Sequence, residues 1–154
     1  MLIKNKLLNM SIIKNFNSFN ENASDGSITL TLDDVVATKH NLGGRGKDKA
    51  SIMKNWSWKE DQLLFAKPGY SGSKPQEWDG KQVAIYDLLT KDGKYFHELG
   101  YAILVDGKVE YIIGIYEPHG CSLNAKRGLV TAHGHEQIIK VWLDDGEFEE
   151  TYTR

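Results

Sequence analysis

The sequence predicts an all-β fold, an antiparallel β-sandwich or a jelly-roll-like barrel, in one domain behind a flexible N-terminal arm. In the second half of the chain, apolar runs alternate with Asp-Gly dipeptides, which are the strongest short-range signal of β-hairpins. Several of these runs are apolar on both faces, and such strands need a second layer to cover them. No segment shows the sustained apolar period of a long amphipathic helix.

The composition is that of an ordinary globular domain. The 154 residues allow a substantial core, and 40% hydrophobic and 26% charged residues are typical of globular proteins. The net charge of -2 gives no general attraction to nucleic acid or to anionic membranes, so we expect neither as a partner. The single Cys121 excludes an internal disulfide framework and fits a reducing compartment.

Residues 1–26 are rich in asparagine and end in a turn, and we expect them to form a flexible or surface-lying arm before a domain at 27–154. Lysines interrupt their apolar residues, whereas a secretory signal needs an uninterrupted apolar stretch of roughly 7–15 residues. No later run approaches the roughly 18 apolar residues of a membrane helix. The sequence therefore predicts a soluble, cytoplasmic protein.

The domain begins with strand-like residues. The segment 27–34, SITLTLDD, alternates polar and apolar residues and predicts a half-buried strand with Ile28, Leu30 and Leu32 on one face. The segment 35–40, VVATKH, keeps β-branched residues and predicts a second short strand.

The middle of the chain is less regular. Residues 41–49, NLGGRGKDK, are glycine-rich, but Lys47 is followed by Asp48 instead of the Ser or Thr of a nucleotide-binding P-loop. Two interpretations of this loop are left: the tip of a hairpin, or a backbone nest that binds an anion. The segment 50–66 fits either a short helix or two strands, and 67–81 is predicted as loop because prolines alternate with glycines and serines.

Four strongly apolar runs after Gly80 predict a meander of strands. They are QVAIYDLL, KYFHELGYAILV, KVEYIIGIYE and QIIKVWL. Asp-Gly turns follow the first, second and fourth of them, and the central residues of such tight turns need positive φ. The hairpin around Asp106 and Gly107 carries the clearest signal, and EFEETYT follows the last turn.

Three of the five histidines lie between the third and the fourth of these runs. In a strand, residues i and i+2 point the same way, so His133 and His135 would present both imidazoles to one surface. Glu117 and His119 have the same spacing, and on neighbouring strands the four side chains would form a ligand set for zinc, nickel, iron or manganese. Alternatively, the triplet is a solvated turn in which Gly134 supplies a positive φ.

Residues 128–148, GLVTAHGHEQIIKVWLDDGEF, resemble the first motif of the cupin barrels: a glycine, a spacer, His-x-His, a glutamate and a strand that ends in glycine. The resemblance implies that His133 and His135 are metal ligands. It covers this segment alone, because Glu136 follows the second histidine directly and would point to the opposite face. The histidine of the family's second motif also has no counterpart after Gln137.

A metal-free reaction is a further alternative for the same histidines. His119 and either His133 or His135 would act as acid and base, since imidazole titrates near physiological pH. Basic side chains would then hold the phosphate of a phosphodiester, namely those of Lys126, Arg127 or the Arg45–Lys47 loop.

Aromatic residues in the loop-rich half favour ligand binding. Indole rings stack on sugar faces, and neighbouring amides and carboxylates supply the hydrogen bonds. The predicted ligand-binding residues are Trp56, Trp58, Tyr70, Trp78 and Asp79. Core packing is the alternative for the first two, whereas Trp78 stands between charged residues and is the better exposed platform.

Three classes of function follow from these features. The leading hypothesis is a non-enzymatic module that binds a polar ligand such as a carbohydrate through the loop aromatics. The second is a metal-binding protein or metal-dependent enzyme, with a divalent metal as the only predicted cofactor. The third is a protein-interaction module, an inhibitor or an assembly subunit, that pairs or oligomerises through exposed strand edges.

Overall fold

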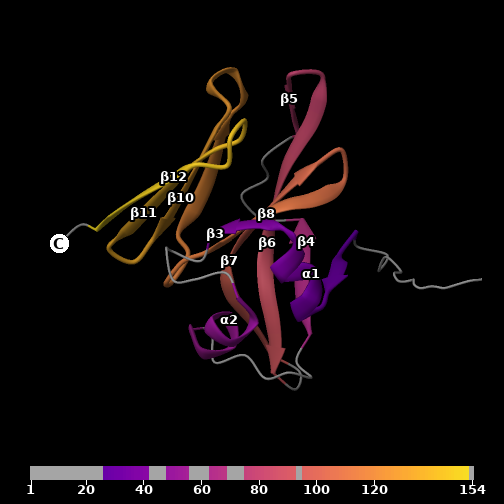
Figure 1. The fold of residues 1–154 in the computed structure, drawn as a ribbon, viewed down its shortest axis with the longest axis vertical. Coiled ribbons are helices and arrows are strands. Elements are labelled where there is room, and N and C mark those ends of the chain that lie inside the picture. Colours follow the sequence, from indigo (N-terminus) through magenta and orange to yellow (C-terminus); the bar gives the residue numbers. More distant parts are fainter. Residues whose placement is uncertain (1–25, 42–47, 56–62, 69–74, 93–94, 153–154) are drawn as a thin grey trace, which may run out of the picture.

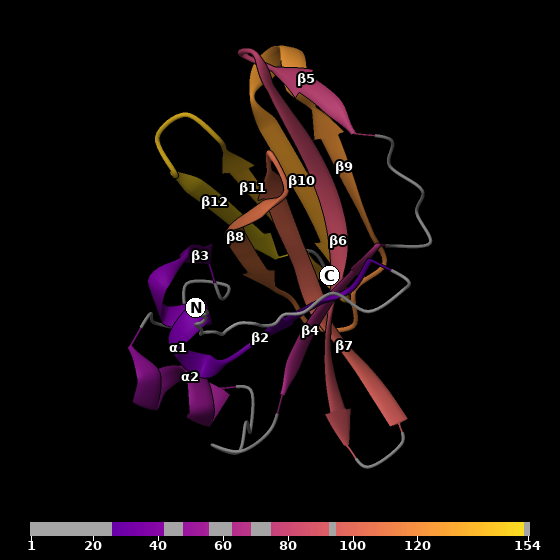
Figure 2. The same ribbon diagram turned by 90° about the vertical axis from the view of Figure 1, so that its right-hand side faces the viewer.

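The computed structural model describes residues 26–41, 48–55, 63–68, 75–92 and 95–152. These residues form two packed β-sheets and two short α-helices in three layers (Figure 1, Figure 2). The predicted all-β sandwich is confirmed. The described strands do not close into a barrel, because both sheets end in open edges.

The larger sheet has the strand order β2-β4-β6-β7-β8-β3, and β5 also pairs with β6. Its strands are β2 Ile28–Leu30, β3 Lys39–Asn41, β4 Leu64–Pro68, β5 Gln76–Trp78, β6 Lys81–Asp92, β7 Tyr95–Val105 and β8 Lys108–Gly114. All pairs are antiparallel except β3 with β8. The predicted turn between β7 and β8 is confirmed, with Asp106 at φ 51° and Gly107 at φ 79°.

The smaller sheet is wholly antiparallel, in the order β12-β11-β10-β9. Its strands are β9 Gly120–Asn124, β10 Leu129–Gly134, β11 Gln137–Trp142 and β12 Phe148–Tyr152. A 3-10 turn, η1 Ala125–Arg127, connects β9 to β10. The connection from β8 of the larger sheet to β9 of the smaller one spans residues 115–119, so it lies where the chain changes layers.

Two apolar clusters hold the three layers together. Side chains alternate along a strand, so each face of the larger sheet packs on a different neighbour. One face packs on the helices through Val35, Ile52 and Leu88. The other packs on the smaller sheet, where Ile103 and Ile139 belong to the same buried cluster.

The expectation of strands throughout 27–40 is wrong for its middle part. Only Ile28–Leu30 is extended at first, and helix α1, Leu32–Ala37, follows before β3. Thr31 begins this helix with a capping box: its hydroxyl accepts from Asp34 N–H, and the Asp34 carboxylate accepts from Thr31 N–H. This reciprocal pair satisfies two backbone N–H groups at the helix start, and a polar–apolar pattern read as a strand overlooks it.

The ambiguous segment 50–66 contains most of a helix and the first residues of a strand, since α2 spans Lys49–Asn55 and β4 begins at Leu64. The loop prediction for 67–81 is wrong at both ends and near its C-terminal side: residues 67 and 68 end β4, Lys81 begins β6, and Gln76–Trp78 forms β5. Gln76 fixes this strand to the other sheet, because its side chain donates to Leu123 O and accepts from Ala125 N–H.

The predicted arm at 1–26 lies outside the described residues except for Gly26. Among the helices that the structure describes, none is long and apolar enough to cross a membrane.

Candidate metal centre

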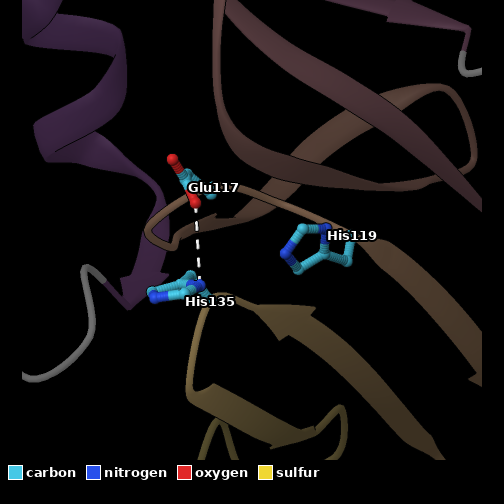
Figure 3. Close-up of side chains that lie close together, drawn as sticks. All are labelled: Glu117, His119 and His135. Atoms are coloured by element: carbon cyan, nitrogen blue, oxygen red, sulfur yellow. Dashed lines mark ion pairs between the residues drawn. The ribbon is translucent and has the colours of Figure 1, made fainter.

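Three of the predicted metal ligands meet where the chain passes between the sheets (Figure 3). Glu117 and His119 lie in the β8–β9 connection, and His135 lies in the turn between β10 and β11. Each offers one ligand atom, and these atoms all lie within 4.8 Å of one another. All three side chains are exposed, so an ion has access from solvent.

Backbone hydrogen bonds fix the two segments that carry these ligands. His119 N–H donates to His133 O at 2.7 Å, and His135 N–H donates to Tyr116 O at 2.7 Å. The buried Gln137 adds a third bond, because its amide oxygen accepts from Tyr116 N–H at 3.0 Å. The ligand-bearing backbone is therefore held in place by the fold itself.

A glycine allows the two segments to come this close. A Cβ atom at Gly134 would lie 2.5 Å from Tyr116 O and 2.8 Å from Ile115 Cγ1. Side chains essentially never approach a carbonyl oxygen so closely, so any other residue would push the turn away from the β8–β9 connection. The glycine of the His-Gly-His triplet thus serves a close approach between segments.

His135 lies between two carboxylates. Its Nδ1 is 3.7 Å from Glu117 Oε2, and its Nε2 is 3.7 Å from Glu136 Oε2. The expectation that Glu136 points away from His135 is wrong, because β10 ends at Gly134 and both residues belong to the turn. The Tyr116 ring lies beside the imidazole, with 5.7 Å between the ring centroids.

The two carboxylate residues share an uncommon backbone conformation. Glu117 has φ 46° and Glu136 has φ 56°. The other two described non-glycine residues at positive φ, Asp79 and Asp106, precede glycines in tight hairpin turns, where such angles are ordinary. Glutamate has no such turn preference, and strained backbone of this kind is concentrated at functional sites.

Two imidazole nitrogens and one carboxylate oxygen form a donor set that suits zinc and related divalent ions. Bonds of about 2.0–2.1 Å to a tetrahedral ion place the ligand atoms roughly 3.4 Å apart. The present spacing therefore needs a contraction of at most about 1.4 Å, which rotation of exposed side chains supplies. Three protein ligands leave one coordination position for water or another molecule.

His133 does not belong to this group of side chains. It is exposed on β10, and only its backbone carbonyl takes part, as acceptor for His119 N–H. The regular alternation that would have aligned it with His135 ends at Gly134, where the turn begins.

Trp78 and Asp79 line a separate, open cleft of about 990 Å³ between the β5–β6 hairpin and the smaller sheet. Glu77, Lys126 and Asp144 also line this cleft, so it is strongly polar. Trp78 is only partly buried and packs against the cluster between the sheets. The other three aromatic residues predicted to bind ligand, at positions 56, 58 and 70, lie outside the described residues.

The basic groups of the metal-free alternative are far from the histidines along β9. Lys126 and Arg127 belong to η1, beyond the end of this strand, whereas His119 precedes its start. The Arg45–Lys47 loop lies outside the described residues.

Sequence reasoning missed a group of ionisable side chains near the larger sheet. Burial raises the pKa of the Cys121 thiol to about 12, and the nearby Asp87 carboxylate adds to this shift. Burial also raises the pKa of the Tyr101 phenol, and the pKa of the Glu98 carboxyl is raised by burial and by the charge of Asp87. These residues come from β6, β7 and β9, so no local sequence motif signals their proximity.

Comparison with known proteins gives no match to a family model, to a curated protein or to a solved structure. The function is therefore inferred from the residues of the site.

Proposed function

We propose that this protein binds a divalent metal ion of the zinc class through Glu117, His119 and His135. The convergence of their three ligand atoms within 4.8 Å carries the proposal. The hydrogen bonds between the two segments support it, because a site whose backbone is already in place loses little conformational entropy when an ion binds.

The bound ion would keep an exchangeable position. Structural zinc sites use four protein ligands, whereas sites that act on other molecules use three and hold water in the fourth position. With three exposed ligands, this centre belongs to the second kind, and the ion would accept an external donor there.

Metal titration of protein produced without a histidine tag tests the proposal. We expect one Zn²⁺ per chain after removal of bound metal with a chelator, and loss of this binding in His119→Ala and His135→Ala. His133→Ala is the matched control: it removes an exposed imidazole two residues away and should leave the affinity unchanged. Absence of stoichiometric binding in the wild type, or equal loss in His133→Ala, contradicts the proposed site.

A polar ligand in the cleft beside Trp78 is a second candidate function. The cleft supports it, because an indole wall among carboxylate and amide groups suits a carbohydrate or a similar polar molecule. A panel of sugars should quench tryptophan fluorescence, and Asp79→Asn should weaken this response while keeping the positive φ that Asn tolerates. An unchanged response in Asp79→Asn and in Lys126→Ala would place any sugar elsewhere. A protein partner, an oligomeric state and a cytoplasmic location stay predictions from the sequence.

A further inference from the structure

We propose that Glu136 is a positioning residue of this centre, which holds His135 through Nε2 and so presents Nδ1 to the ion. The inference rests on the proposed metal site. It assigns to Glu136 a role outside the coordination sphere, distinct from the roles of the three ligands.

The two nitrogens of His135 face different groups. Nδ1 lies on the side of Glu117, a member of the ligand group, at 3.7 Å from its carboxylate. Nε2 is 3.7 Å from the Glu136 carboxylate, which is not a member of that group. A histidine that ligates a metal through one nitrogen donates the N–H of the other to a carboxylate or carbonyl, which fixes its tautomer and ring orientation. Glu136 lies on the side where such a partner stands, and a small side-chain rotation would bring its carboxylate from 3.7 Å to hydrogen-bond distance.

The backbone of Glu136 is rigidly placed for this contact. The turn between β10 and β11 consists of two residues, since Gly134 pairs with Gln137 across it. Gln137 is 3% exposed, and its amide nitrogen donates to Glu150 Oε2 at 2.8 Å. Because both ends of the turn are anchored, the φ of 56° at Glu136 sets the direction in which its side chain leaves the backbone.

Two ordinary surface ion pairs would not account for a glutamate at position 136. Exposed ion pairs contribute little to stability, and the side chains of His135, Glu117 and Glu136 are more than half exposed. Glycine would suit position 136 better than glutamate, because it adopts positive φ without steric cost. A carboxylate kept at an unfavourable backbone position, beside a candidate ligand, points to a task that glycine cannot perform.

The substitution Glu136→Gly separates positioning from folding, because the two effects have opposite signs. Glycine relieves the backbone conformation, so the metal-free variant should melt at the same temperature as the wild type or higher. Loss of the carboxylate should raise the Kd for Zn²⁺ by roughly 10- to 100-fold, the usual effect of losing such a partner. Glu136→Gln keeps an acceptor oxygen and should recover part of the affinity. Glu149→Gln, which removes an exposed carboxylate from β12, should leave the Kd unchanged.

The absorption spectrum of bound Co²⁺ tests whether Glu136 stays outside the coordination sphere. At saturating Co²⁺, Glu136→Gly should show the same d–d bands as the wild type, because the ligand atoms are unchanged. Altered bands would make Glu136 a ligand and overturn the inference, as would an unchanged Kd for Zn²⁺. If the wild type binds no ion, the proposed function itself fails; if the wild type and Glu136→Gly bind equally well, only the role of Glu136 fails.

Discussion

Cys121 is the only thiol of the chain; it is half-buried, and its surroundings disfavour the thiolate. The thiolate is the reactive form, and burial raises the thiol pKa to about 12, so almost none is present at neutral pH. We expect the folded protein to resist a thiol reagent such as dithionitrobenzoate at pH 8 and to react stoichiometrically in urea. Rapid modification of the folded protein would show that the thiol is exposed.

This property of Cys121 was hidden in the sequence. Thiol reactivity depends on neighbours, and the ionisable groups near Cys121, Asp87 and Tyr101, come from β6 and β7 of the other sheet. The same limit applies to Glu136, whose position beside His135 follows from the turn and not from strand alternation.

The β6–β7 hairpin contains a carboxyl group, that of Glu98, whose charged form is disfavoured in the folded protein. The pKa of Glu98 is raised from its ordinary value of 4.5, because of partial burial and the charge of Asp87. A raised carboxyl pKa contributes stability below the unfolded pKa and loses it as pH rises through the folded pKa. Glu98 therefore favours the folded state least at neutral pH.

We accordingly expect Glu98→Gln, which is always neutral, to unfold at a higher urea concentration than the wild type at pH 7. The gain should vanish near pH 3.5, where the wild-type carboxyl is also protonated in both states. Since the side chain is mostly exposed, the shift should be small. Glu149→Gln serves as control, because its carboxylate is exposed on β12 and pairs with Lys140. A gain of equal size at both pH values would exclude the charge as its cause.

At the level of elements, strands bounded by Asp-Gly turns were predictable and short elements were not. The signal at Asp106 and Gly107 is local and complete, so the β7–β8 hairpin follows from it. The helix at Leu32–Ala37 was missed because its signal, the capping box of Thr31 and Asp34, overlaps an alternating pattern. Strand β5 was missed because contacts with the smaller sheet, through Gln76, hold it.

The candidate site was predictable in part. The sequence grouped Glu117 and His119 with His135, and one ligand atom of each does lie within 4.8 Å of the others. That they bind a metal stays a prediction. Strand alternation also predicted that His133 would lie beside His135. Its side chain does not join the group, because the strand ends at Gly134 and His135 belongs to the turn. The exact end of a strand depends on contacts with other segments, here on Tyr116 O and the His135 N–H.

For the whole molecule, metal binding should act as a link between sheets. Glu117 and His119 lie on the connection that leaves the larger sheet, and His135 lies in a hairpin turn of the smaller one. An ion that binds only the folded state stabilises it by about 2.7 kcal/mol at a free concentration of 100 times Kd. For a chain of this size we expect the Tm to rise by roughly 5–10 °C with Zn²⁺. Excess chelator should reverse the rise, and His135→Ala should show none.

The sandwich itself was predictable because two-sided apolar strands leave few alternatives. Strands such as β8 need cover on both faces, and the structure supplies helices on one and a second sheet on the other. The number of layers was not predictable, because the helices contribute only a few buried side chains, such as Val35 and Ile52.

Gly134 has a kinetic consequence. Because Gly134 has no Cβ atom, the turn packs directly against Tyr116 O. The ligand atoms are therefore close together before any ion binds. Capture of the proposed ion would then require only side-chain rotation, which takes picoseconds to nanoseconds at exposed residues. Uptake should be limited by diffusion and by water exchange at the ion, without a slow folding phase.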